Sequence, residues 1–266
     1  MRATEQKLIL SIFPGIDLLG RAFEDEGYCV VRGPDLLWGG DIRKFQPPEG
    51  VFWGVIGGSP CQDFSGLRRD APTGYGREML SEFARCVTLA SPEWWLLENV
   101  ARVPNVTIRG YKWQRFDIDQ GWYESTRRLR HIQFGSRSGV LLDIERRSVT
   151  PEAQGAILAN DGRGWRDMAR SQGLPDDWDL PGFTVKAKKR AIGNAVPYSM
   201  GRVLAWSVTK AFTLGASRDR GCRCGCGRRV TGKRLYYDFS CRKRAQRNRE
   251  RAVSRRDVTE PGHSRE

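Results

Sequence analysis

The chain has 266 residues, 39% of them hydrophobic and 10% aromatic, which is enough for one α/β domain with a small appendage. No apolar run reaches the roughly 18 residues that a membrane helix needs. The formal net charge is +14, and residues 215–266 carry +10 of it, from 16 Lys and Arg against six Asp and Glu. Such a polycationic segment predicts a polyanionic partner. The alternative is a tail that only improves solubility.

The beginning of the chain lacks the charged, apolar and small-residue sections of a signal peptide. We therefore expect a cytoplasmic protein, in a bacterial or phage-infected cell, that is monomeric and makes no membrane contact. In that compartment the seven cysteines are thiols or metal ligands rather than disulfides.

Predicted strands and helices alternate along the chain. Hydrophobic patterning predicts strands at 8–13, 28–32, 52–56, 94–97, 113–118, 131–134 and 140–144, and helices at 17–25, 78–89 and about 197–212. This alternation predicts a doubly wound, mainly parallel sheet. The composition changes near Gly215, so we expect a domain of residues 1–214 and a Cys/Arg-rich module of residues 215–266 with a disordered end.

A lone cysteine and a glutamate follow two of the predicted strands. Cys61 lies on the turn Gly57-Gly-Ser-Pro-Cys-Gln62, directly after the run 52–56, and Glu98 follows the run 94–97. Open α/β sheets place their chemistry at the carboxyl ends of such strands. Cys61 is thus a candidate nucleophile and Glu98 a candidate acid, although a cysteine is also often a small buried apolar residue.

Two further places suit a bound cofactor. The turn Phe13-Pro-Gly-Ile-Asp17 lets the backbone approach a ligand closely. Asp35 follows the second strand at a distance suited to ribose hydroxyls, and Asp41 lies a few residues on. Each of these, taken alone, could be an ordinary loop residue.

Four short motifs occur in the order found in DNA (cytosine-5)-methyltransferases. They are residues 57–62, Glu98-Asn-Val100, Arg128-Leu-Arg130 and Gly193-Asn-Ala-Val-Pro197. The chain resembles that family from about residue 8 to residue 208, and four ordered motifs are far more specific than one. The resemblance implies a Rossmann-like S-adenosylmethionine-dependent methyltransferase fold, S-adenosyl-L-methionine as the cofactor and duplex DNA as the partner. The tRNA-modifying branch, or a DNA-binding relative without activity, are the alternatives.

The resemblance also assigns roles to the residues of the predicted reaction centre. Cys61 would add to carbon 6 of a flipped-out cytosine, since carbon 5 is too weak a nucleophile to be methylated unaided. Glu98 would supply a proton at nitrogen 3. Arg128 and Arg130 would hold the carbonyl oxygen at position 2 and orient Glu98, with Arg130 as the direct contact. We expect loop amides or nearby cations to activate the Cys61 thiol.

Asn99 would hold the cysteine loop by side-chain hydrogen bonds, and the remaining assignments concern cofactor and DNA. The predicted cofactor-binding residues are Phe13, Gly15, Asp17, Asp35, Asp41, Ile42, Pro60, Asn194 and Val196. The predicted DNA-binding residues are Gln62, Ser65, Arg68 and Arg69 in the loop closing over the base, Arg137 and Arg163 in a recognition region at 135–186, and Arg242, Lys243 and Arg244 in the tail. So little room for recognition predicts a short or relaxed target sequence.

Three positions depart from the family pattern. Asp17 stands where the family usually has a second glycine, and Ser11 replaces the usual aspartate ahead of Phe13. Thr126 stands in place of the usual glutamine before Arg128. These departures concern the cofactor site more than the type of reaction, because Cys61 and Glu98 are both retained.

Four cysteines of the tail, Cys222, Cys224, Cys226 and Cys241, could close a tetrahedral zinc site. The alternative is unliganded cysteines in a disordered basic tail. Tyr236, Tyr237 and Phe239 could pack a small core there.

Restriction–modification, genome protection and regulation are all biological roles that fit a DNA methyltransferase of the kind that the resemblance implies.

Overall fold

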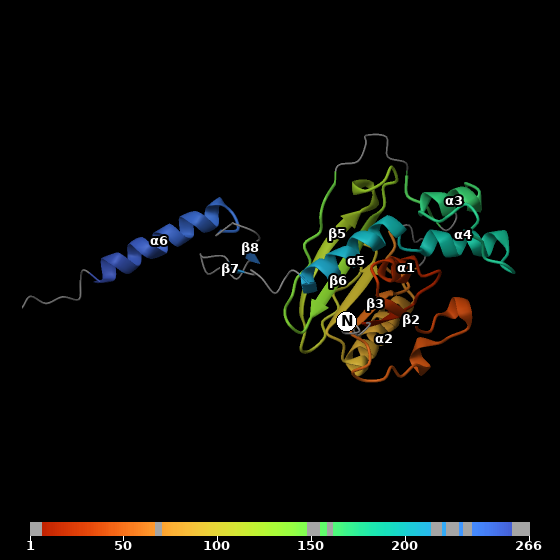
Figure 1. The fold of residues 1–266 in the computed structure, drawn as a ribbon, viewed down its shortest axis with the longest axis horizontal. Helices are drawn as coiled ribbons and strands as arrows, with labels where there is room; N and C mark the ends of the chain where they lie inside the picture. The colour runs from red at the N-terminus through yellow and green to blue at the C-terminus, as the bar shows by residue number, and fades with distance from the viewer. Residues whose placement is uncertain are drawn as a thin grey trace, which may run out of the picture. The chain divides into compact units, whose positions relative to one another are not determined.

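The computed structural model describes residues 7–66, 71–147, 155–158, 162–213, 220–221, 229–230 and 236–256. The chain divides into two compact units, Met1–Ala211 and Phe212–Glu266. The first unit holds a six-stranded sheet with helices around it (Figure 1).

The sheet has the order β2-β1-β3-β4-β6-β5. Neighbours among the first four strands pair in parallel, whereas β6 pairs antiparallel with both β4 and β5. Within this sheet β6 alone therefore runs against the other strands, and the predicted mainly parallel sheet is confirmed. The strands are β1 Leu8–Ile12, β2 Cys29–Arg32, β3 Gly54–Gly58, β4 Trp94–Asn99, β5 Lys112–Asp119 and β6 Leu129–Ser136.

The three predicted helices are present, as α1 Leu18–Asp25, α2 Tyr75–Ala90 and α5 Tyr198–Thr213. Three helices were not predicted, α3 Trp165–Ser171, α4 Val185–Asn194 and, in the second unit, α6 Phe239–Arg256. The side chain of Thr184 caps α4 by accepting from the amide of Ala187, a signal that the sequence contains. Three short 3₁₀ helices complete this unit, η1 Leu36–Trp38, η2 Ile42–Lys44 and η3 Gln120–Trp122.

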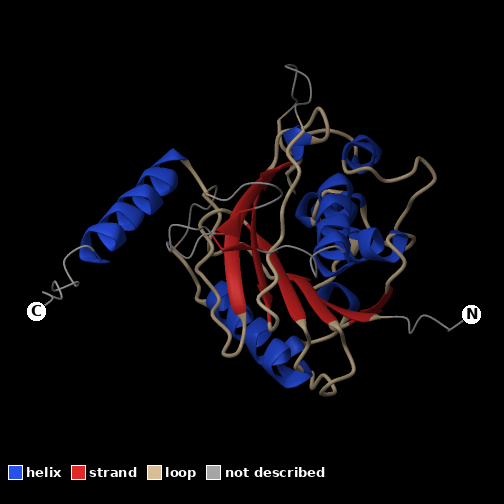
Figure 2. Ribbon diagram, turned by 60° about the vertical axis from the view of Figure 1, so that its left-hand side comes forward, coloured by secondary structure: helices blue, strands red, loops and turns tan. Residues whose placement is uncertain are grey.

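Helices cover both faces of the sheet (Figure 2). Adjacent residues of a strand point to opposite faces, and two consecutive tryptophans of β4 show which helix covers each face. Trp94 stacks on Phe23 of α1, with ring centroids 5.6 Å apart. Trp95 packs edge-on against Phe83 of α2 at 6.0 Å.

The strand predicted at 140–144 is absent, and this prediction was wrong. The segment follows β6, which is already paired on both sides, and it forms no backbone ladder with β5, the edge strand of the sheet. Side chains hold the segment instead. Ser136 donates to the carbonyl of Val140 at 2.8 Å, and Gln114 donates to the carbonyl of Leu142 at 3.1 Å.

The second unit contains two short paired strands and one long helix. The strands are β7 Arg220–Gly221 and β8 Arg229–Val230, and the helix is α6 Phe239–Arg256. Val230, Cys241 and Ala245 are buried together, with Tyr236 packed against them. Tyr237 and Phe239 are 51% and 69% exposed, so the expectation that they also pack in this core was wrong.

The predicted zinc ligands Cys222, Cys224 and Cys226 lie outside the described residues, so the zinc site stays a prediction. Within the part of the chain that the structure describes, no cluster of three His, Cys, Asp or Glu could hold a metal ion. Cys241 is buried, and of the two cysteines in apolar runs, Cys86 is fully buried and Cys29 half-buried.

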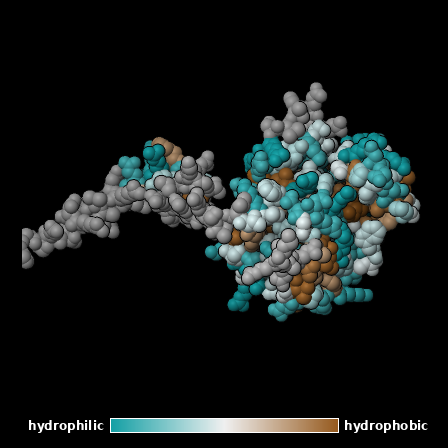
Figure 3. Space-filling view, in the orientation of Figure 1, coloured by the Kyte–Doolittle hydropathy of each residue, from teal (hydrophilic) through white to brown (hydrophobic). Residues whose placement is uncertain are grey.

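Hydrophilic side chains cover most of the face shown in Figure 3, with a few apolar areas between them. Among the described residues, no helix combines the length and apolar character that crossing a membrane requires.

Candidate active site

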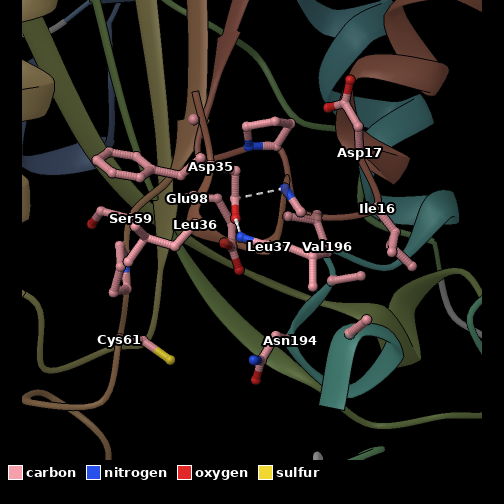
Figure 4. A pocket seen from close by; sticks show the side chains of 18 of the residues that line it. Ile16, Asp17, Asp35, Leu36, Leu37, Ser59, Cys61, Glu98, Asn194 and Val196 are labelled. Atoms are coloured by element: carbon pink, nitrogen blue, oxygen red, sulfur yellow. Dashed lines mark hydrogen bonds between the residues drawn. The ribbon is translucent and has the colours of Figure 1, made fainter. Parts of the chain in front are cut away.

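A cavity of about 680 Å³ opens at the carboxyl ends of β1, β3 and β4 (Figure 4). This volume lies in the usual range for small-molecule sites. Residues from all four predicted motifs line it. The predicted site residues that line it are Phe13, Gly15, Asp17, Asp35, Asp41, Ile42, Pro60, Cys61, Gln62, Glu98, Arg128, Arg130, Asn194 and Val196.

Cys61, Glu98 and Arg130 converge on this cavity. Cys61 follows β3 and is half-buried, and Figure 4 shows its sulfur directed into the space. Glu98 is the penultimate residue of β4 and is 7% exposed. The Nε of Arg130 lies 2.9 Å from Oε1 of Glu98, so a cation from β6 fixes the carboxyl group.

Burial changes the acidity of both groups. It raises the pKa of Glu98 above its usual value, and Arg130 and Arg128 oppose that rise. Burial also raises the pKa of the Cys61 thiol, with a further contribution from the nearby Glu98. The two arginines and a backbone hydrogen bond lower the pKa of Cys61, as expected of cations and loop amides, but burial and Glu98 raise it by more.

The loop that carries Cys61 is tied to β4 by Asn99. Its amide nitrogen donates to the carbonyl and to the hydroxyl of Ser59, at 3.0 and 2.9 Å. Its amide oxygen accepts from the backbone of Val100 at 2.8 Å. The role predicted for Asn99 agrees with these bonds. After Cys61 the chain turns sharply, since its carbonyl accepts from the amides of Phe64 and Ser65.

Arg128 lines the cavity but directs its guanidinium at backbone carbonyls. It donates to the carbonyls of Gly193 at 2.7 Å, of Ala195 at 3.1 Å and of Ile157. Burial lowers its pKa to about 9, assisted by the neighbouring Arg130. Arg128 is 2% exposed. It therefore supports the segment that holds Asn194, whereas Arg130, the arginine predicted to make the direct contact, is the one that lies beside Glu98.

Asp35 and Gly15 meet at the other end of the cavity. The carboxylate of Asp35 accepts from the amide of Gly15 at 2.9 Å and from that of Leu37 at 2.7 Å. The indole of Trp38 donates to the carbonyl of Gly15 at 2.7 Å, and its ring packs edge-on against Phe183. Asp35 and Trp38, at the two ends of η1, therefore hold the turn after β1 by the backbone N–H and the backbone C=O of Gly15.

The neighbouring positions expected at the cofactor differ in their surroundings. The carboxylate of Asp41 is paired with Arg43, with Nη2 of the arginine 2.8 Å from Oδ2. Ile42 is buried in the core that α2 covers. The carboxylate of Asp17 bonds to Ser11, and Figure 4 shows it turned away from Cys61 and Asn194. A direct contact of Asp17 with a ligand is therefore not what this orientation favours.

The residues predicted to bind DNA fall in different places. Gln62 lines the cavity, whereas Arg68 and Arg69 lie outside the described residues. Arg163 donates to the carbonyl of Ala156 at 3.4 Å.

Arg137 follows β6 at the end that pairs with Trp94, the edge of the sheet opposite Cys61. Six residues of β6, 131–136, lie between it and Arg130 at the cavity, and seven steps of about 3.3 Å make roughly 23 Å. Its guanidinium bonds to the hydroxyls of Tyr111 and Ser91. Arg137 therefore lies away from Cys61 and Glu98, because β6 runs back across the sheet, and its contact with DNA stays a prediction.

Sequence reasoning missed four contributions to the site. Lys186 and Arg190 line the cavity from α4, and their spacing of four residues would have placed them on one helical face had that helix been predicted. Tyr75 lines it from the start of α2. Asp63 accepts from the amides of Thr73 and Gly76 and so joins the cysteine loop to α2.

Residues 38–109 match a family model described as C-5 cytosine-specific DNA methylase, and this stretch includes Cys61 and Glu98. The predicted resemblance to the cytosine-5 methyltransferases is confirmed. No curated protein sequence matches the chain.

Solved structures of methyltransferases share the fold. A DNMT2 variant from Spodoptera frugiperda aligns with 77% of this chain and 100% of its own, with a TM-score of 0.57 at 13% identity. The Entamoeba histolytica methyltransferase EhMeth aligns with 81% and 100%, with a TM-score of 0.56 at 9% identity. A putative DNA modification methyltransferase from an E. coli prophage aligns with 78% and 99%, with a TM-score of 0.53 at 14% identity. The predicted Rossmann-like methyltransferase fold is thus confirmed.

Proposed function

We propose that this protein transfers a methyl group from S-adenosyl-L-methionine to carbon 5 of a flipped-out cytosine in duplex DNA, through a covalent adduct with Cys61. The observation that carries the proposal is the convergence of Cys61, Glu98 and Arg130 on one cavity that extends to Asp35 and Gly15. Residues 1–214 would form the catalytic domain, and residues 215–266 a basic module.

Each of the three side chains has a separate task. The sulfur of Cys61 forms a bond to carbon 6, which makes carbon 5 nucleophilic. Glu98, whose pKa is raised, holds a proton at nitrogen 3 and so neutralises the charge that develops on the ring. Arg130 keeps the Glu98 carboxyl in place. Once carbon 5 carries the methyl group, a water molecule accepts the carbon 5 proton and the electrons of that bond re-form the ring double bond. The electron pair of the Cys61–carbon 6 bond leaves with sulfur as the thiolate.

The cofactor end of the cavity fits S-adenosylmethionine, which when bound supplies the methyl group as an electrophile. Asp35 and the backbone of residues 13–16 would hold it, with Asn194 and Val196 on the facing wall. Asp35 already bonds two amides there, so its carboxylate is fixed before a ligand arrives. The volume is ample for a nucleoside and a second small group together.

The basic helix α6 supports a nucleic-acid substrate. It carries eight Lys and Arg against one Glu, and the predicted phosphate-binding residues Arg242, Lys243 and Arg244 are exposed on it. Both duplex DNA and tRNA would be attracted by this charge. The family model that matches residues 38–109 is one of DNA methylases, and this favours DNA.

A methyl-transfer assay with labelled cofactor on duplex DNA and, separately, on tRNA tests the proposal. We expect label in DNA, at carbon 5 of cytosine by bisulfite sequencing. The matched control is Cys61→Ser, which should lose turnover while still binding DNA and cofactor. Label in tRNA alone would show that the substrate is tRNA and not DNA. Full activity of Cys61→Ser would show that Cys61 is not the nucleophile.

A further inference from the structure

The turn between β1 and α1 has a backbone conformation that side chains rarely adopt. Phe13, Gly15 and Asp17 have φ angles of 55°, 57° and 53°. Only glycine adopts this left-handed region without steric cost, so other contacts must hold Phe13 and Asp17 there. Because this turn forms a wall of the cavity, the contacts that hold it also shape the site.

Asp17 makes most of these contacts. Its Oδ1 accepts a hydrogen bond from the Ser11 hydroxyl at 2.8 Å and another from the Gly20 amide at 3.0 Å. Its Oδ2 lies 2.9 Å from Nε of Arg32. Ser11 and Arg32 are register partners on β1 and β2. One carboxyl group, on a residue only 5% exposed, therefore joins two strands to the start of α1.

Gly20 belongs to the same arrangement. A Cβ at this position would lie 2.2 Å from Oδ2 of Asp17, so no other residue fits while the carboxylate is in place. The position of the Asp17 side chain thus depends on a glycine three residues on. Ser11, Asp17 and Gly20 therefore form one buried cluster and not an incidental contact on the surface.

We propose that Ser11 and Asp17 are positioning residues that act as one unit to hold residues 13–16 in the shape that forms the cofactor end of the cavity. The proposal rests on the proposed function for the identity of the ligand. Both residues depart from the family pattern, and the structure shows that the two departures are bonded to each other. The carboxylate is on the helix side of the contact and the hydroxyl on the strand side.

This pairing predicts how the two positions depend on each other. A carboxylate introduced at Ser11 would face that of Asp17 within hydrogen-bonding distance, and like charges so close repel. Removal of the Asp17 carboxylate alone would leave the Ser11 hydroxyl and the Gly20 amide without their acceptor. In the double variant the contact again contains one carboxylate, now at position 11. A glycine then occupies position 17, where the backbone is left-handed.

The experiment is a double-mutant cycle on binding of S-adenosylhomocysteine, measured by calorimetry on the full chain. We expect Ser11→Asp and Asp17→Gly each to weaken binding by about tenfold or more, and the double variant to bind within about threefold of the parent. The gentler pair, Ser11→Ala and Asp17→Asn, serves if a single variant does not fold. An outcome in which the losses of the two single variants simply multiply in the double variant would overturn the proposal.

A failure of the proposed function has a different signature. If the parent protein binds no S-adenosylhomocysteine, the function proposed above is wrong, whatever the variants do. The same cycle on the melting temperature then decides whether Ser11 and Asp17 act as a unit. Coupled melting temperatures support the positioning role in the turn, and additive ones contradict it.

Discussion

Gly58 and Glu98 are register partners at the carboxyl ends of β3 and β4, and the glycine leaves the room that the glutamate occupies. A Cβ on Gly58 would lie 3.2 Å from Oε2 of Glu98, closer than side chains normally approach. The carboxyl group is held from its other side by Arg130. Its position therefore depends on the absence of one methyl group on the neighbouring strand.

We predict that Gly58→Ala lowers turnover by about tenfold or more, because the Glu98 carboxyl must shift by a few tenths of an ångström and small misplacements are costly in catalysis. Turnover on duplex DNA is the measurement. Gly155→Ala is the matched control, since nothing lies within 4 Å of a Cβ at that position. Equal activity of the two variants would show that Glu98 tolerates the added methyl group.

The raised pKa of Cys61 predicts a slow reaction of this thiol with iodoacetamide at neutral pH. Only the thiolate reacts, so the rate should rise with pH and should still be rising above about pH 8.5, the usual pKa of a free cysteine. Glu98→Gln removes a negative neighbour, which lowers the pKa of Cys61. Alkylation of Cys61, followed by peptide mass spectrometry at about pH 7.5, should then be about threefold faster or more. An unchanged rate would mean that Glu98 is not ionised beside Cys61.

Replacing Arg128 should mainly lower stability, whereas replacing Arg130 should mainly lower turnover. Arg128→Met leaves the carbonyls of Gly193 and Ala195 without a donor and should cost about 3 kcal/mol of unfolding free energy. Arg130→Met should reduce turnover by about a hundredfold while costing less stability, because the Glu98 left behind can take up a proton. Urea unfolding and turnover, measured on both variants, check this. Equal stability losses would contradict the division of roles.

The basic helix α6 should contribute to the salt dependence of DNA binding. Replacing Arg242, Lys243 and Arg244 by glutamine should reduce the slope of log affinity against log salt by up to about 2.7, because each phosphate that is no longer neutralised lowers it by roughly 0.9. Fluorescence anisotropy on duplex DNA at several salt concentrations measures the slope. A matched control replaces Arg109, Lys112 and Arg202, which are exposed in the first unit and lie outside the predicted recognition region, and it keeps the change in net charge equal. If the slope falls equally in both variants, only the net charge of the protein matters, and the predicted contribution of α6 is wrong.

Much of the fold could be predicted because hydrophobic periodicity is a local property. The six strands that form the sheet and the helices α1, α2 and α5 are long enough, or apolar enough, to appear in their own residues. The helix α4 was missed because it is rich in lysine and buries a narrow face. The strand predicted at 140–144 is absent for another reason. Whether an apolar segment pairs as a strand depends on the strands that lie next to it, and these come from distant parts of the chain.

The order of four motifs by itself indicated the resemblance to the cytosine-5 methyltransferases and predicted that Cys61 and Glu98 lie at one cavity. The direction of β6 decided the rest, because an antiparallel strand takes Arg130 to the cavity and Arg137 to the opposite edge of the sheet. Only the tertiary structure showed that Arg128 supports backbone carbonyls and that Ser11 bonds Asp17. Sequence patterns report which residues are present, whereas the bonds of a buried polar group depend on segments that folding brings together from far along the chain.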